Sequence, residues 1–486
     1  MGFRLNREYF GRLLLLAAAL AAGAGCGRGL IATLGPDYQG VESGVAADWR
    51  PAPPEAALER DTAPKDAADW WRRFNDPLLI KLLAAADAAS GSVAQAQARI
   101  ASARADLTGA VAAGLPAVDG NFGAGSTAFS FGGPVYNRNQ FFIGAQTSWE
   151  IDLFGGLARQ READVSRLAA RQADWRAARA AAAAETANAY LAFRHCERLR
   201  ELAAMDASAR RNAAGLVATA AGFGLRSAAD AALSRASAAD GESLCLQRGL
   251  QCDQAIKALA TLTAVDESRL RNWLTESAGL PEPPPLALPA MPAELLLRRP
   301  DVAAAERAVA EAGALVGVAE AARYPRLTLT GSIQYAIQNI SPSPLALAQT
   351  WSVGPTISLP IFDAGKRAAN QAAAEVQYRA AETAFRQSAR QAVREVEEAL
   401  LRIHAAVDRL PQARIATEGY RRNVAASEEL YRAGLGSLLS VEENRRSAIA
   451  AETALAELRQ ERVAAWIALY RATGGGWRNE EWECCQ

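Results

Sequence analysis

Residues 301–332 read DVAAAERAVAEAGALVGVAEAARYPRLTLTGS, and this stretch combines the two kinds of secondary structure that the chain uses. Its first part is an alanine-rich amphipathic helix pattern. At Tyr324-Pro325 the apolar period changes from 3.6 to 2, because apolar and polar side chains alternate from Leu327 to Ile337. The stretch therefore predicts a helix that leads directly into a β-strand.

The same pattern occurs earlier in the chain, in SVAQAQARIASARADLTGAVAAGLPAVDG from Ser92. Here a helix is expected to begin near Pro77 and to continue to about Ala113. Pro116 matches Pro325, and Ile100 matches Val309, at one offset of 209 residues (325 − 116). Solenoid units are about 20–50 residues long, so this offset indicates a duplicated half-molecule. We expect a first repeat over 69–279, a Pro-rich linker over 280–292, and a second repeat over 293–476, followed by a tail over 477–486.

Each repeat contains a predicted β-hairpin, at 117–152 and at 326–361. Apolar residues occupy one face of these strands and mostly polar residues the other, which is typical of barrel strands between lipid and water. A half-buried hairpin of a soluble sheet has the same alternation. The residues predicted to face lipid are Phe141, Ile143, Trp149, Leu329, Ile333, Trp351, Val353 and Ile357.

A long helical hairpin follows each pair of strands. The 67 residues from Gly155 to Ala221 contain no proline, and as one helix they would span about 100 Å. Glycines break the helical pattern at 222–224 and again at 434–436. The return helix of the first hairpin is expected to run to about Ser277. The second long helix carries a strict heptad seam, which predicts coiled-coil packing with charged faces in water. The seam consists of Phe385, Ala389, Ala392, Val396, Ala399, Ile403, Ala406 and Leu410.

The N-terminus, over 1–25, has arginines, an apolar run too short to span a membrane, and small residues before Cys26. This predicts a secretory signal peptide and a lipoprotein whose first mature residue is the acylated Cys26. An ordinary signal peptide with a chance cysteine is the alternative, because Gly23 replaces the usual leucine. The segment 26–68 is expected to be extended.

The charge balance argues against nucleic acid as a partner. Lys+Arg and Asp+Glu both number 53, so no basic excess exists to bind the phosphates of a nucleic acid.

Cys196 and Cys252 lie 28 residues on either side of Gly224, at equal heights on the two predicted helices, and are candidates for a disulfide. Cys245 competes as a partner. No cysteine or histidine spacing predicts a metal site, and no cofactor motif is present.

Two rival function classes fit the sequence less well. An enzyme could use the carboxylate pairs Glu150/Asp152 or Glu442/Glu443, but no nucleophile or base accompanies either pair. A trimeric adhesin would not require duplicated strand pairs.

Four strands cannot close a membrane barrel, which needs about eight, and open edges are not tolerated in lipid. Several copies must therefore share one barrel, which indicates an oligomeric conduit.

Seven segments resemble the outer membrane factor family, the TolC-like ducts of efflux pumps, and within it the OprM/NodT-type lipoprotein branch. They are GPDY (35–38), WWRRFNDPLL (70–79), SWEIDLFGGLAR (148–159), LLLRRPDVAAAERAVAEA (295–312), YPRLTLTGS (324–332), PIFDAGKR (360–367) and GGGW (474–477). The resemblance covers nearly the whole chain. It implies a mainly α fold in a homotrimer, with a shared twelve-strand transmembrane β-barrel and a long periplasmic α-helical barrel.

The resemblance also implies a function and partners. We expect a lipid-anchored outer-membrane duct, without enzyme activity, that exports small molecules together with a periplasmic adaptor and an inner-membrane pump of the RND type. The duct of a type I protein-secretion system is the alternative. The two glycine tips are expected to form the periplasmic aperture and the adaptor contact, through Gly222, Phe223, Gly224, Tyr431, Gly434, Leu435 and Gly436. Gly436 replaces the acidic residue that many relatives have near this tip.

Overall fold

The computed structural model describes residues 33–42, 44–45, 67–276, 279–282, 296, 299–340 and 344–475. The expected signal peptide, Cys26, most of the linker and the C-terminal tail lie outside these residues. Contacts divide the chain into two compact units, and each draws on both halves of the sequence. Unit 1 comprises 1–41, 100–170 and 305–384, and unit 2 comprises 42–99, 171–304 and 385–486.

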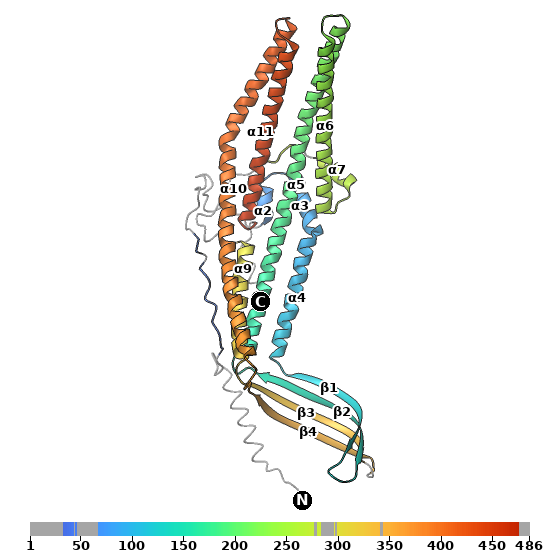
Figure 1. Cartoon of the computed structure of the whole chain (residues 1–486), viewed down its shortest axis with the longest axis vertical. Helices are drawn as coiled ribbons and strands as arrows, with labels where there is room; N and C mark the ends of the chain where they lie inside the picture. The colour runs from blue at the N-terminus through green and yellow to red at the C-terminus, as the bar shows by residue number, and fades with distance from the viewer. Residues whose placement is uncertain are drawn as a thin grey trace. The chain divides into compact units, whose positions relative to one another are not determined.

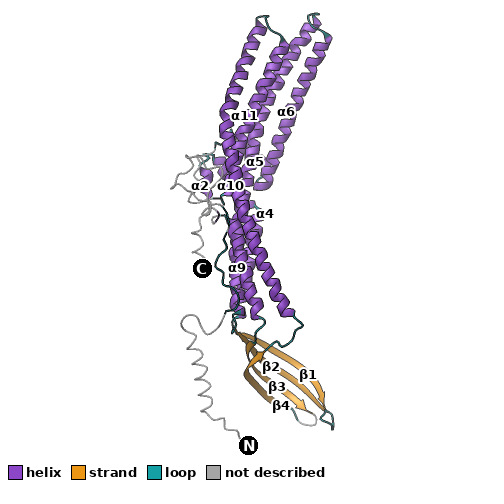
Figure 2. Cartoon of the chain, turned by 60° about the vertical axis from the view of Figure 1, so that its left-hand side comes forward, coloured by secondary structure: helices purple, strands orange, loops and turns teal. Residues whose placement is uncertain are grey.

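The described residues form helices and one small sheet (Figures 1 and 2). The helices are α2 (Ala67–Arg72), α3 (Pro77–Ala89), α4 (Gly91–Ala113), α5 (Gly156–Gly222), α6 (Ala228–Thr263), α7 (Glu267–Thr275), α9 (Pro300–Ala321), α10 (Lys366–Arg432) and α11 (Leu438–Ala472). The strands are β1 (Ala117–Phe129), β2 (Tyr136–Ile151), β3 (Arg326–Ile340) and β4 (Ala346–Ser358). The mainly helical fold class with four strands is confirmed.

The two long helices match their predicted extents closely. Both α5 and α10 contain 67 residues. All eight positions of the heptad seam in α10 are buried, although Pro411 interrupts the backbone hydrogen bonding of that helix. No described helix is by itself long and apolar enough to cross a membrane, whereas α3 and α4, which meet at a bend of 46°, would qualify together by length and composition.

Two predicted helices are each interrupted by a turn. The helix predicted to continue to Ala113 is broken at Ser90, between α3 and α4. The return helix of the first hairpin was expected to reach Ser277, but α6 ends at Thr263 and Ala264 adopts a left-handed conformation with φ of 51°. A separate helix, α7, then begins after its N-cap Asp266. Between α6 and α7 the chain thus turns without a glycine or proline, whereas Gly91 follows Ser90 at the first break.

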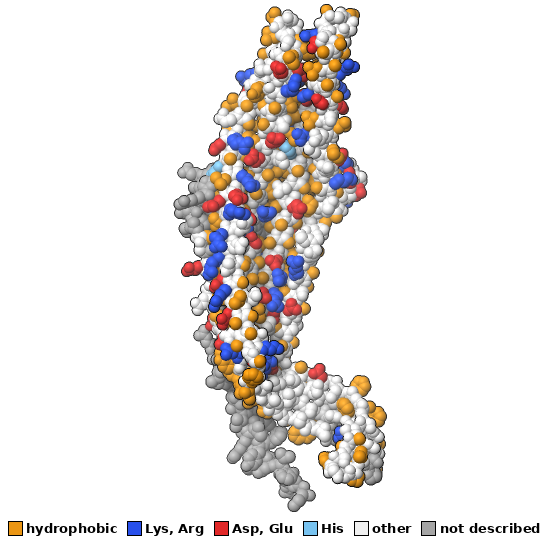
Figure 3. All heavy atoms as spheres, viewed as in Figure 1, with side chains coloured by type: hydrophobic (Ala, Val, Ile, Leu, Met, Phe, Trp, Pro, Cys, Tyr) orange, Lys and Arg blue, Asp and Glu red, His pale blue; other side chains and the backbone are white. Residues whose placement is uncertain are grey.

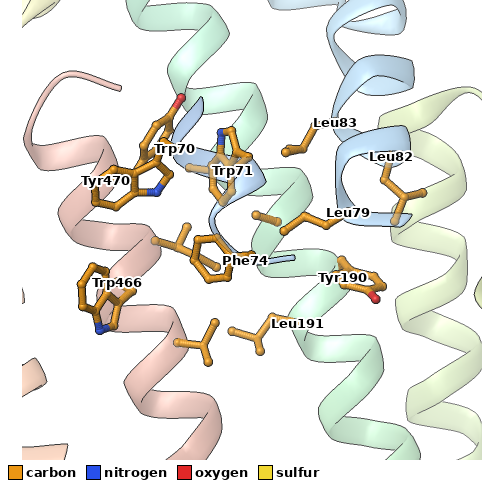
Figure 4. Packing of buried hydrophobic residues seen from close by; sticks show 14 of the residues in the cluster. Trp70, Trp71, Phe74, Leu79, Leu82, Leu83, Tyr190, Leu191, Trp466 and Tyr470 are labelled. Atoms are coloured by element: carbon orange, nitrogen blue, oxygen red, sulfur yellow. The ribbon is translucent and has the colours of Figure 1, made fainter. Parts of the chain in front are cut away.

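The largest hydrophobic cluster lies in unit 2 and is built around aromatic side chains from α2 and α11 (Figure 4). The ring centroids of Trp71 and Tyr470 are 4.6 Å apart, and those of Trp70 and Trp466 are 6.1 Å apart. The long helices bury many small alanines, whereas each of these aromatics buries a large apolar area, so the cluster adds strongly to the packing of the helices.

A buried polar network fixes the start of α3 against α5. Asp76 caps α3 by accepting hydrogen bonds from the backbone N–H groups of Leu78 and Leu79. Its second oxygen accepts a 2.7 Å hydrogen bond from the hydroxyl of Tyr190, whose oxygen in turn accepts one from Nε of Arg194. Burial raises the pKa of Tyr190 to about 12, so the hydroxyl remains a donor at physiological pH.

Candidate functional site

The sheet of unit 1 has antiparallel strands in the order β1-β2-β3-β4, and its register sorts the side chains into two faces. Trp149 pairs with Leu329, and Leu329 pairs with Pro355. Ile333 pairs with Trp351 in the same way. Because paired residues share a face, all eight residues predicted to face lipid lie on one face of the sheet.

That apolar face is largely open. Trp351 and Val353 are each 68% exposed, and Ile357 is 70% exposed. Trp149 and Leu329 are half-buried, and the indole N–H of Trp149 donates to the carbonyl of Gly114. Charged side chains are frequent over the helices and few on the side of the sheet in view in Figure 3. An apolar face of this extent requires an apolar environment or partner.

The opposite face is mainly polar. The hydroxyls of Ser332 and Ser352 are 2.8 Å apart across β3 and β4. Phe142 is an aromatic exception on this face. It covers Gly123, where an added Cβ would lie 2.6 Å from the phenyl ring. The sheet thus has one apolar face and one mainly polar face, as the alternation predicted.

The two outer strands have free edges within the part of the chain that the structure describes. There, β1 pairs only with β2, and β4 pairs only with β3. The exposed N–H and C=O groups of a strand edge need partners when water is excluded. The isolated sheet is therefore incomplete as a membrane structure.

The two hairpin turns of unit 2 have the same backbone structure, and they lie at the same end of that unit (Figure 1). Gly224 and Gly434 both have φ of 73°. Leu225 donates to the carbonyl of Ala220, and Leu435 donates to that of Leu430, each at 2.9 Å. This is the Schellman helix end, in which a left-handed glycine follows the last helical turn.

Gly222 and Gly436, the other two glycines at the tips, differ in whether the local structure requires a glycine. Gly222 is the last residue of α5, and an added Cβ there would meet no atom within 4 Å. A Cβ at Gly436 would lie 3.1 Å from the backbone nitrogen of Tyr431. Gly436 thus permits the chain to pass close to the end of α10, whereas Gly222 has no evident steric role.

Large apolar side chains are exposed at both tips. Phe223 and Leu435 are each 78% exposed, and Leu225 is 76% exposed. Tyr431 lies in the last turn of α10 and is half-buried. Exposed apolar side chains at a turn are typical of a protein contact surface. The structure thus brings together the residues predicted for the aperture in two equivalent turns.

The structure joins Cys196 of α5 and Cys252 of α6 in a disulfide, with Cα atoms 5.4 Å apart. Cys245 is free. The bond links two antiparallel helices of the first hairpin. At the corresponding offset of 210 residues (434 − 224), the second hairpin has Ala406 and Arg462, so it has no such bond.

We expect the double substitution Cys196→Ser/Cys252→Ser to lower the free energy of unfolding by about 2–4 kcal/mol, because the unfolded chain then loses a cross-link. Non-reducing peptide mapping of the wild-type protein should recover the two cysteines in one linked peptide pair. Cys245→Ser is the control and should leave both the map and the stability unchanged. Three free thiols, or a bond from Cys245, would contradict the prediction.

One member of each carboxylate pair considered for catalysis has a structural partner. Asp152 accepts a 2.8 Å hydrogen bond from the backbone N–H of Ala158 at the start of α5. Glu442 forms a 2.8 Å ion pair with Arg445. Across the described ranges, no group of three or more potential metal ligands occurs.

Two buried arginines that the sequence reasoning did not select join segments far apart in the chain. Arg159 donates to the carbonyl of Leu34 at 2.9 Å and pairs with Asp37 at 2.6 Å, in unit 1. Nearby, an added Cβ at Gly35 would lie 2.5 Å from Cα of Gly317, so α9 and the N-terminal segment make a close backbone contact. Arg159 thus clamps the GPDY segment to the start of α5.

Arg299 acts in the same way in unit 2. It donates to the carbonyl of Ala472 at 2.9 Å, and it pairs with Asp301 and with Glu395 at 2.6 and 2.9 Å. The contacts join the start of α9 to α10 and to the end of α11. Both arginines belong to sequence motifs quoted above. Their charge inside those motifs is the signal from which their structural role could have been predicted.

Comparisons with known proteins agree with this architecture. Residues 82–265 and 291–475 match the family model described as outer membrane efflux protein. The chain is 30% identical to the outer membrane protein OprJ of Pseudomonas aeruginosa, over 92% of this chain and 93% of that protein. It is 27% identical to the solvent efflux pump outer membrane protein SrpC of Pseudomonas putida, over 91% and 95% of the two chains. The solved structure of the outer-membrane channel OprN superimposes with a TM-score of 0.80, at 28% identity, over 92% of this chain and 99% of that one.

Proposed function

Because this chain belongs to the outer membrane efflux protein family and is an outer-membrane efflux channel subunit, we propose that three copies form one exit duct of a tripartite pump. Each copy contributes four strands to a shared barrel and two helical hairpins to a periplasmic tunnel. The observation that carries the proposal is the four-stranded sheet, which has a continuous apolar face and two unpaired edges.

The unpaired edges of β1 and β4 explain why one copy cannot form a closed barrel. Pairing β1 of one copy with β4 of the next satisfies both edges, and three copies give twelve strands (3 × 4), above the minimum of about eight for a closed barrel. The apolar faces then contact outer-membrane lipid, and the polar faces line the lumen. A duct of this kind acts by position and not by chemistry, so we propose no enzyme activity.

The hairpin tips supply the contact with a periplasmic adaptor. Exposed apolar side chains at both turns, notably Phe223 and Leu435, provide the desolvated centre that protein interfaces require. We assign the closing aperture to the same turns, with Tyr431 as its constriction. An inner-membrane pump of the RND type would supply the energy.

We also propose that Cys26 is acylated and anchors the mature chain to the outer membrane. The short apolar run and the small residues before the cysteine support this assignment. The transported substrates are small molecules, an assignment supported by the name of the relative SrpC as a solvent efflux pump protein.

We expect native mass spectrometry of the detergent-extracted protein to detect three chains per particle. In a background with Cys245, Cys484 and Cys485 changed to Ser, a cysteine at Asn121 of β1 should form intermolecular disulfides with a cysteine at Thr350, Ser352 or Gly354 of β4. These positions share the polar face, and the scan covers the unknown register between copies.

The matched control pairs Asn121→Cys with Ser332→Cys, which lies on the same face of the interior strand β3. No intermolecular bond should form there, because β3 is covered by neighbours within its own chain. A monomer, another stoichiometry, or equal cross-linking at the interior strand would overturn the proposed trimer.

A further inference from the structure

Unit 2 contains a cavity of about 610 Å³ whose wall is rich in arginine. Its lining comes from α5, α10 and α11, and from residues 279–282. The arginines in this wall are Arg194, Arg198, Arg414, Arg459 and Arg462. Three glutamates also line it, so the wall has a net positive charge in a chain whose total charge is zero.

Two of these arginines are neutralised by the protein itself. Arg194 forms a 2.7 Å ion pair with Glu197. Arg198 pairs with Glu201 and, at 3.2 Å, with Glu452 of α11. Both guanidinium groups are therefore held in place by carboxylates, and their positions on α5 fix one side of the cavity.

The other three arginines have no ion pair with any carboxylate that the structure describes. Arg414 and Arg459 are exposed to the cavity and solvent, while Nε of Arg462 is buried without a hydrogen-bond partner. A buried donor without a partner costs free energy that a ligand oxygen would recover. The positive charge that no described carboxylate balances thus comes from α10 and α11.

We propose that this cavity binds a free polyvalent oxyanion, a molecule with at least two carboxylate or phosphate groups. Guanidinium groups bind both kinds of group through paired hydrogen bonds, and more strongly than neutral donors do. The volume falls within the range of small-molecule sites. An anion there contacts α5 of the first hairpin and α10–α11 of the second, so it links the two hairpins.

The test uses the full-length protein in detergent, with pyrophosphate and citrate as probes and sodium chloride at equal ionic strength as the reference. Calorimetry should detect one site per chain, and either probe should raise the thermal midpoint by about 2 °C near saturation. Arg459→Gln and Arg462→Gln should each weaken binding at least about tenfold, since each removes a charge-assisted hydrogen bond. Arg402→Gln, an exposed position of α10 outside the cavity wall, should bind as wild type.

Three results would overturn the proposal. The first is no heat and no shift beyond those of chloride. The second is equal weakening in Arg402→Gln, which would indicate general charge screening. The third is binding that appears only after Glu480, Glu481 and Glu483 are changed to Gln, since the cavity would then serve an acidic part of this chain. Arg459 is exposed, so its variant tests the site even if Arg462→Gln does not fold. None of these results depends on the trimer or on export.

Discussion

Val353→Arg is expected to remove the folded trimer from outer-membrane fractions. Val353 is 68% exposed on the apolar face of β4, and its neighbour across the strands is Gly331. An arginine at a lipid-facing position near the bilayer midplane costs about 2–4 kcal/mol. A shared barrel would incur this cost once in each of its three chains, so assembly should fail even though each single cost is moderate.

Thr356→Arg is the matched control for this change. Thr356 lies on the same strand, three residues away, and its side chain belongs to the polar face. An arginine there would enter the aqueous lumen and keep its hydration, so trimer abundance should stay close to that of the wild type. The amount of heat-resistant trimer in outer-membrane fractions, measured on gels, decides between the faces. Equal tolerance at both positions would show that the apolar face does not contact lipid.

Periodic features were the part of the fold that the sequence predicted best. The heptad seam from Phe385 to Leu410 is buried at every position, and the strand alternation places the eight apolar residues on one face. Both patterns are local, because a residue's face follows from the backbone period alone. The glycine tips were also predictable, since Gly224 and Gly434 adopt a backbone conformation that other residues rarely take.

Features set by distant partners were not predictable. Ala264 ends α6 in a left-handed conformation although alanine favours helix, so the residue at the turn itself gives no signal of it. Arg159 pairs with Asp37, and Arg299 with Glu395, residues that are 122 and 96 positions away in the chain. A charged residue in a motif indicates that a partner exists, but only the tertiary fold identifies the partner. The arginine cavity was missed for the same reason.

Gly434→Val is expected to abolish export while the trimer remains abundant. Gly434 has φ of 73°, and a β-branched residue in this conformation is strained by about 1–3 kcal/mol. The strain falls on the turn that positions Leu435, whose side chain is 78% exposed and available to an adaptor. It does not affect the sheet, because the turn belongs to unit 2 and the strands belong to unit 1.

Gly215→Val separates this effect from that of a larger side chain on the same hairpin. Gly215 lies within α5 without a positive φ, and its added side chain would meet open space. That variant should export normally, and Gly224→Val should fail as Gly434→Val does, because the two glycines occupy equivalent places in their turns. Drug susceptibility, trimer abundance and cross-linking to the adaptor are measured together in all three variants. Normal export by Gly434→Val would exclude this turn from the aperture. Loss of the trimer in Gly434→Val would mean that the turn serves assembly. Only failed export and weak adaptor contact in an intact trimer support the assignment of this turn to the aperture.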